Sequence, residues 1–163
     1  MKAKRALAVG ILVATGCLAT TKASDWAISP EFDFNKTYTV ALVSEDGSSL
    51  DQTAYNQVSL QLLKVGNIKI LERERVQDLL QEQEFGTTGA VDPSSAASIG
   101  KLTGADVIGV VSFTHNQNTL LIKLVEAETG QVLYMGQGMA ADFSTAAQRA
   151  LKPLLDQAAS HKK

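Results

Sequence analysis

The chain has 163 residues, enough for one domain that buries its own core without a disulfide or a structural metal. Its composition, with 45% hydrophobic, 20% charged and 6% aromatic residues, is that of a globular protein and excludes global disorder. The formal net charge is -2, and no stripe of Lys and Arg with interleaved aromatics occurs, so we do not expect nucleic-acid binding.

A basic start and an apolar run, MKAKRALAVGILVATGC, open the chain. The run of about ten residues would reach only ~15 Å as a helix, too short to cross ~30 Å of hydrocarbon, so residues 1–16 are interpreted as a signal peptide. The ending Ala14-Thr15-Gly16-Cys17 resembles a bacterial lipobox. That resemblance implies that Cys17 is acylated and becomes the first mature residue; the alternative is a plain secretory peptide with an incidental Cys. Removal of the peptide leaves 12 basic and 17 acidic side chains, a charge of -5.

Residues 17–36 show neither helical nor strand periodicity, and we interpret them as the lipidated cysteine followed by a short tether. A β-rich apolar run at residues 38–44 predicts a buried strand. Asp51 can cap an amphipathic helix over residues 52–65, and residues 68–71 predict a second strand. The strand–helix–strand order implies two parallel strands joined by a crossover.

Two helices are predicted next. Residues 72–83 have an acidic start that suits the helix dipole. The second helix starts at Asp92-Pro93, with Asp92 as the N-cap and Pro93 at the first helical position. Gly104 is expected to end this helix with a positive φ.

Apolar runs at residues 107–113, 120–125 and 132–137 predict three strands, and their short connections indicate an antiparallel meander. Ser144 is expected to cap a final helix, which Pro153 should kink or restart.

The predicted fold class is α/β, a single mixed sheet in the order β-α-β-α-α-β-β-β-α with helices packed on it. We place the domain at residues 37–158 and a frayed tail at residues 159–163.

Residues suited to catalysis are scarce. Cys17 is the sole thiol, and neither His115, in a predicted turn, nor His161, in the tail, is placed to activate a serine. The turn after the first strand lacks a glycine-rich phosphate-binding pattern. Glu45 and Asp46 could offer oxygens to a hard cation, but the acids of a solvated turn have the same pattern. We therefore expect no enzymatic activity, no cofactor and no metal.

Two segments carry a family resemblance. The first comprises Glu72-Arg73, the run from Leu79 to Glu84, Gly89 and then VDPSSAASIGKLTGADVIGVVSF, from Val91 to Phe113, and the second is LVEAETGQVL, from Leu124 to Leu133. Together they resemble the curli production assembly/transport (CsgG-like) superfamily, whose fold is shared with LpoB-type activators of peptidoglycan synthases, the flagellar lipoprotein FlgO and the N-terminal domain of TolB. The motif residues have structural roles. Gly100 allows close helix packing, Gly104 allows a helix stop, and Gly130 makes a turn.

The resemblance implies a non-enzymatic, membrane-anchored lipoprotein that acts as a protein-binding or scaffold module in cell-envelope or surface-appendage assembly. One alternative is a regulatory activator of a peptidoglycan synthase. Another is an accessory component of a curli-type secretion apparatus. It would not be the pore itself, because the turns HNQN and ETGQ have no room for the long hairpins that build a pore.

Leu18 after Cys17 implies sorting to the outer membrane, with the domain facing the periplasm. We expect envelope protein partners and membrane contact through the lipid anchor, and the sequence leaves a homo-oligomer open. The candidate partner-binding residues are Glu45 and Asp46 in an acidic turn and Phe85 in a glycine-rich loop. Phe85 either anchors a partner or closes the core beneath its loop.

Replacement of Cys17 tests the anchor. In Cys17→Ser the acyl acceptor is lost, so the precursor should stay uncleaved by the lipoprotein peptidase and unlabelled by palmitate analogues. Metabolic labelling and gel mobility measure both. Normal processing and labelling of this variant would contradict the assignment.

Overall fold

The computed structural model describes residues 24–45, 50–82 and 93–161. They form one mixed six-stranded sheet with four helices packed on it, which confirms the predicted fold class. The elements in chain order are β1 (Ser24–Ile28), β2 (Tyr38–Ser44), α1 (Gln52–Leu63), β3 (Ile68–Ile70), α2 (Arg73–Glu82), α3 (Pro93–Thr103), β4 (Val107–Thr114), a 3-10 turn (His115–Gln117), β5 (Thr119–Glu126), β6 (Val132–Met139) and α4 (Phe143–His161).

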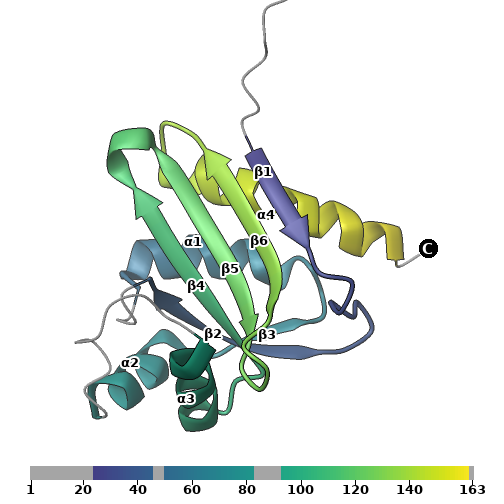
Figure 1. Cartoon of the computed structure of the whole chain (residues 1–163). Coiled ribbons are helices and arrows are strands. Elements are labelled where there is room, and N and C mark those ends of the chain that lie inside the picture. Colours follow the sequence, from purple (N-terminus) through teal and green to yellow (C-terminus); the bar gives the residue numbers. More distant parts are fainter. Residues whose placement is uncertain (1–23, 46–49, 83–92, 162–163) are drawn as a thin grey trace, which may run out of the picture.

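The strands lie in the order β1-β6-β5-β4-β2-β3 (Figure 1). β2 is parallel to both of its neighbours, β3 and β4, and all other pairs are antiparallel. The predicted parallel pair β2–β3 and the predicted meander β4–β5–β6 are therefore confirmed. The contact between β2 and β4 joins the two halves of the sheet.

The sheet starts earlier in the chain than predicted. β1 pairs with β6 from Ser24 opposite Gly138 to Ile28 opposite Tyr134. Residues 24–28, which the sequence analysis assigned to the tether, therefore belong to the sheet. The sequence pattern did not predict this strand, because β1 is an edge strand with three successive exposed residues and so lacks the two-residue period of a half-buried strand.

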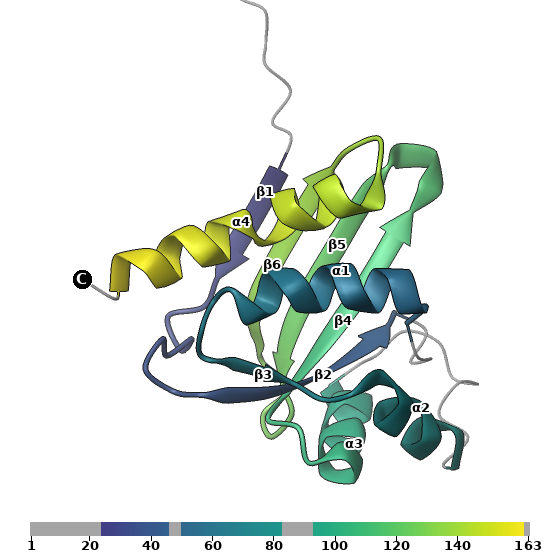
Figure 2. The ribbon, with the colours of Figure 1, turned by 180° about the vertical axis from the view of Figure 1, so that it is seen from behind.

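The helices cover the two faces of the sheet unequally (Figures 1 and 2). α1 and α4 lie on one face and bury the larger hydrophobic core. On the other face α2 and α3 pack against β2, β4 and β5 over a smaller core. None of the helices described here is long and apolar enough to span a bilayer.

The start of α4 differs from the prediction. Asp142 is the cap, because its carboxylate accepts a hydrogen bond from the Thr145 backbone N–H at 2.8 Å. This hydrogen bond from the Thr145 backbone lowers the pKa of Asp142 below its ordinary value. The predicted cap, Ser144, instead donates its hydroxyl to the Gln57 side chain of α1 at 3.0 Å. A contact with a distant helix thus decides which of two suitable residues caps α4.

α4 also continues past both of its expected breaks. It runs unbroken through Pro153, where the loss of one backbone donor is offset by the buried Leu151 and Leu154 on either side. Residues 159–161, predicted as part of a frayed tail, are helical. The ring of His161 stacks on Phe34, with centroids 4.4 Å apart, and this contact holds the last turn.

The closest approach in the larger core lies between α4 and β6. A Cβ added at Gly136 or Gly138 would collide with the backbone of α4 around Ala146 and Ala150, so glycine is required at both strand positions. Between these contacts the fully buried Tyr134 donates its hydroxyl to the Ala150 carbonyl oxygen at 2.5 Å. The close approach of the two backbones and the hydrogen bond of the Tyr134 hydroxyl together hold α4 on the sheet.

The buried phenol should make the stability of the domain sensitive to alkali. Burial raises the pKa of Tyr134 above its ordinary value of 10.0. Its contribution to stability is therefore complete below about pH 10 and is lost as the pH rises above it. Tyr134→Phe should cost about 1 kcal/mol at pH 7 through the lost hydrogen bond, and its deficit against the natural protein should shrink near pH 11.

Urea unfolding at the two pH values measures this difference. Tyr55→Phe is the matched control, since the pKa of half-buried Tyr55 is also raised by burial but its hydroxyl bonds Leu71 outside the α4 contact. Between pH 7 and pH 11 the free energy of unfolding should fall for both variants, and Tyr55→Phe should reduce this fall less than Tyr134→Phe does. An identical deficit for Tyr134→Phe at both pH values would contradict the burial argument.

Gly104 ends α3 with a φ of +74°, and a Cβ added to it would lie in open space. Only the backbone conformation therefore opposes a side chain here. Gly104→Val should lower the free energy of unfolding by more than about 1 kcal/mol, because a β-branched residue disfavours positive φ. Gly104→Asn is the control and should cost less, since Asn tolerates this conformation. Equal urea midpoints for Val and Asn would disprove a conformational cost.

Candidate functional site

The described residues do not assemble a recognisable catalytic or metal-binding centre. In the described ranges no group of three His, Cys, Asp or Glu side chains could hold a metal ion. Nδ1 of His161 lies 3.4 Å from Ser160 Oγ and 2.9 Å from the Gln157 carbonyl oxygen, an exposed contact in the last turn of α4. Cavities and exposed faces are therefore the remaining candidates for a functional site.

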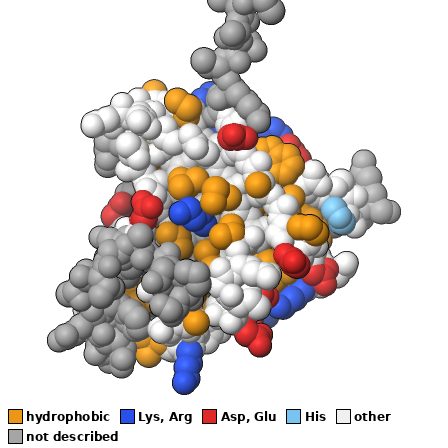
Figure 3. Space-filling view, viewed as in Figure 1, with side chains coloured by type: hydrophobic (Ala, Val, Ile, Leu, Met, Phe, Trp, Pro, Cys, Tyr) orange, Lys and Arg blue, Asp and Glu red, His pale blue; other side chains and the backbone are white. Residues whose placement is uncertain are grey.

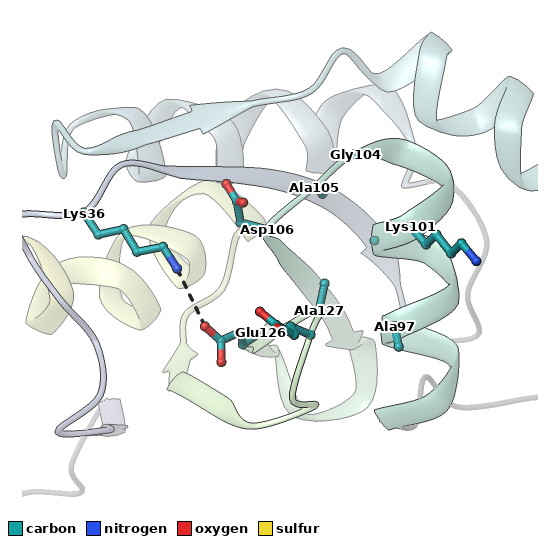
Figure 4. A pocket seen from close by; sticks show the side chains of 10 residues that line it. Lys36, Ala97, Lys101, Gly104, Ala105, Asp106, Glu126 and Ala127 are labelled. Atoms are coloured by element: carbon teal, nitrogen blue, oxygen red, sulfur yellow. Dashed lines mark ion pairs between the residues drawn. The ribbon is translucent and has the colours of Figure 1, made fainter.

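A cavity of about 420 Å³ lies between the end of α3 and the turn that joins β5 to β6 (Figure 4). Lys36 enters from the segment after β1 and pairs with Glu126 at 3.8 Å. Its Nζ also lies 5.0 Å from the centre of the Tyr38 ring. The Asp106 carboxylate accepts the Thr39 backbone N–H at 2.8 Å. These interactions hold the loops against the sheet, so Lys36, Asp106 and Glu126 are already engaged within the protein.

The glycines around this cavity have structural roles. A Cβ on Gly100 would collide with the Cβ of Ala127, so this glycine lets α3 lie directly on the end of β5. Gly130 turns the chain between β5 and β6 with a φ of 72°. Lys101 extends away from the other charged side chains of the cavity (Figure 4). We therefore interpret this cavity as a consequence of how α3 packs on the sheet, and not as a ligand site.

A second feature is the part of the sheet that α2 and α3 leave uncovered. Gly136 and Gly138 face α4, so the alternate residues Met135 and Met139 point to the opposite face, where they are 36% and 43% exposed. A hollow of about 180 Å³ lies on this part of the sheet. Its lining residues are Asp25, Trp26, Ala27, Leu121, Met135 and Gln137. We call the exposed surface of β5, β6 and β1 the open face.

Figure 3 shows the open face with hydrophobic side chains gathered around a basic one. The strand register places one lysine on this face. Lys123 of β5 stands beside Val110 of β4 and Met135 of β6. Its neighbours two positions away along β5 are Leu121 and Val125. A half-buried lysine therefore stands among four apolar side chains.

The sequence-predicted interaction residues lie elsewhere or outside the described residues. Glu45 is exposed directly after β2. Asp46 and Phe85, together with the anchor Cys17 and the cap Asp92, lie outside the described residues and stay predictions. Their proposed common surface is therefore not tested.

Sequence reasoning missed the open face, although a signal was available. β5 reads TLLIKLVE, with one lysine inside an otherwise apolar strand. A strand of this pattern has one face in a core and one face with a single charge. Which face lacks a helix depends on how many helices pack on each side, and the strand itself does not encode that.

The sequence profile of the family described as curli production assembly/transport component CsgG matches residues 18–121. Among curated proteins, none matches the chain.

Several solved structures resemble the chain at low sequence identity. The LpoB C-terminal domain from Escherichia coli is 18% identical, with 64% of this chain and 83% of that chain covered and a TM-score of 0.48. PelC from Paraburkholderia phytofirmans, solved as a dodecamer, is 12% identical, with 81% and 96% covered and a TM-score of 0.44. Lipoprotein GNA1162 from Neisseria meningitidis is 16% identical, with 76% and 94% covered and a TM-score of 0.44. Since the profile match spans more than half of its length, the chain belongs to the CsgG family of curli production assembly/transport components.

Proposed function

We propose that this protein is a non-enzymatic lipoprotein that binds another envelope protein through the open face during cell-envelope or surface-appendage assembly. The observation that carries the proposal is the uneven cover of the sheet, which leaves Met135, Met139 and Leu121 partly exposed on one continuous surface. Contiguous exposed apolar surface of this kind is typical of a protein-interaction site.

Membership of the CsgG family supports a place in the envelope and in assembly or transport. The lipobox-like ending at Cys17 supports a lipid anchor, and Leu18 after it supports the outer membrane, with the domain in the periplasm. The scarcity of catalytic groups supports a binding role, because Cys17 is the sole thiol in the sequence and the histidines number two. The two alternatives, an activator of a peptidoglycan synthase and an accessory secretion component, would use the same surface and differ in the partner.

Site-specific photo-crosslinking tests the open face as a binding surface. Benzoylphenylalanine in place of Met135, in the full chain and in its own bacterium, should give a discrete adduct heavier than the chain after irradiation. The same probe in place of Gln148, exposed on α4, is the control and should give none. Mass spectrometry of the adduct identifies the partner and separates the alternatives. Equal labelling from both positions, or none from Met135, would count against the proposal.

A further inference from the structure

Lys123 is the one half-buried lysine among the described residues, and no counter-charge lies against it there. Lys36 pairs with Glu126, and Lys152 pairs with Asp156 at 2.8 Å. Within the described ranges Lys123 forms neither an ion pair nor a hydrogen bond. Acids flank the surface at Asp25 on β1 and at Glu45 after β2. Each is two strands away from β5, or about 10 Å in the plane of the sheet.

An ammonium group in this position restricts what can cover the open face. While no partner covers the open face, water solvates the Lys123 ammonium group. A purely apolar partner would remove that water from a charge surrounded by Val110, Leu121, Val125 and Met135, at a large desolvation cost. A partner that places a carboxylate against the ammonium offsets this cost and gains a charge-assisted hydrogen bond.

A second copy of this chain meets the requirement poorly. In a two-fold contact whose axis passes beside Lys123, each copy presents the same patch, so the two Lys123 ammonium groups approach each other. Like charges brought together in a desolvated contact oppose binding. The charge pattern of the surface therefore favours a different protein over self-association.

We propose that the open face binds an acidic partner: a protein segment whose Asp or Glu side chain, bordered by apolar residues, pairs with Lys123. The inference rests on the proposed function and adds the chemistry of the partner to it. The apolar border contributes the area that is buried on binding. The single charge makes binding selective, because a partner without the carboxylate leaves Lys123 buried and unpaired.

The test combines the Met135 crosslinking probe with charge variants of Lys123. Lys123→Arg keeps the charge and should keep most of the adduct. Lys123→Met keeps an unbranched apolar chain without the charge and should lower the adduct yield about tenfold or more. Lys123→Glu should abolish the adduct. Thermal unfolding of the purified variants checks that each is folded, as expected for a side chain with no hydrogen-bond or ion-pair partner among the described residues.

The decisive result is charge exchange. Once the adduct is mapped, the partner carboxylate nearest the probe is changed to Lys, and this change should restore the adduct with Lys123→Glu while weakening it with natural Lys123. An adduct from Lys123→Met as strong as from the natural protein would overturn the acidic partner and leave the open face as a binding surface. An adduct of two copies of this chain, or a crosslink within one chain, would also overturn it. No adduct at all would defeat the proposed function as well.

Discussion

The packing of α4 on β6 is the contact on which the rest of the structure depends. Gly136 and Gly138 remove the side chains that would separate helix from strand, and Tyr134 fills the adjacent space while its hydroxyl satisfies the Ala150 carbonyl. Helix and strand backbones can approach this closely because the two glycines have no Cβ to collide with the α4 backbone. The helix then covers one side of β5, β6 and β1, and β1 forms the edge of the sheet.

This arrangement creates an asymmetry with functional consequences. One face has α1 and α4 across most of its strands, whereas the other has the shorter α2 and α3 on β2, β4 and one end of β5. The remaining surface of β5, β6 and β1 carries methionines, a leucine and one lysine, which has no counter-charge in the part of the chain that the structure describes. Flexible methionine side chains suit a surface that must adapt to a partner, while the lysine limits which partner fits.

The position of β1 also sets where an anchored domain would lie. Ser24 begins β1 seven residues after Cys17, so a lipid on Cys17 would hold the β1 edge within about 25 Å of the bilayer. Because β1 borders the open face, that surface would lie close to the membrane. A partner at the open face would then be a membrane-associated protein or one held near the bilayer.

Sequence alone determined the features that depend on neighbouring residues: the apolar periods of β2, β4, β5 and β6, the cap at Asp51, and the stop at Gly104. Local spacing and backbone preference are sufficient for these. Tertiary structure alone decided the rest. β1 is a strand because β6 offers it an edge, and Asp142 caps α4 because Ser144 bonds α1. The role of Lys123 was likewise undetermined, since a strand pattern shows that one side is polar but not whether a helix covers it. That depends on contacts between residues far apart in the chain, which no local pattern contains.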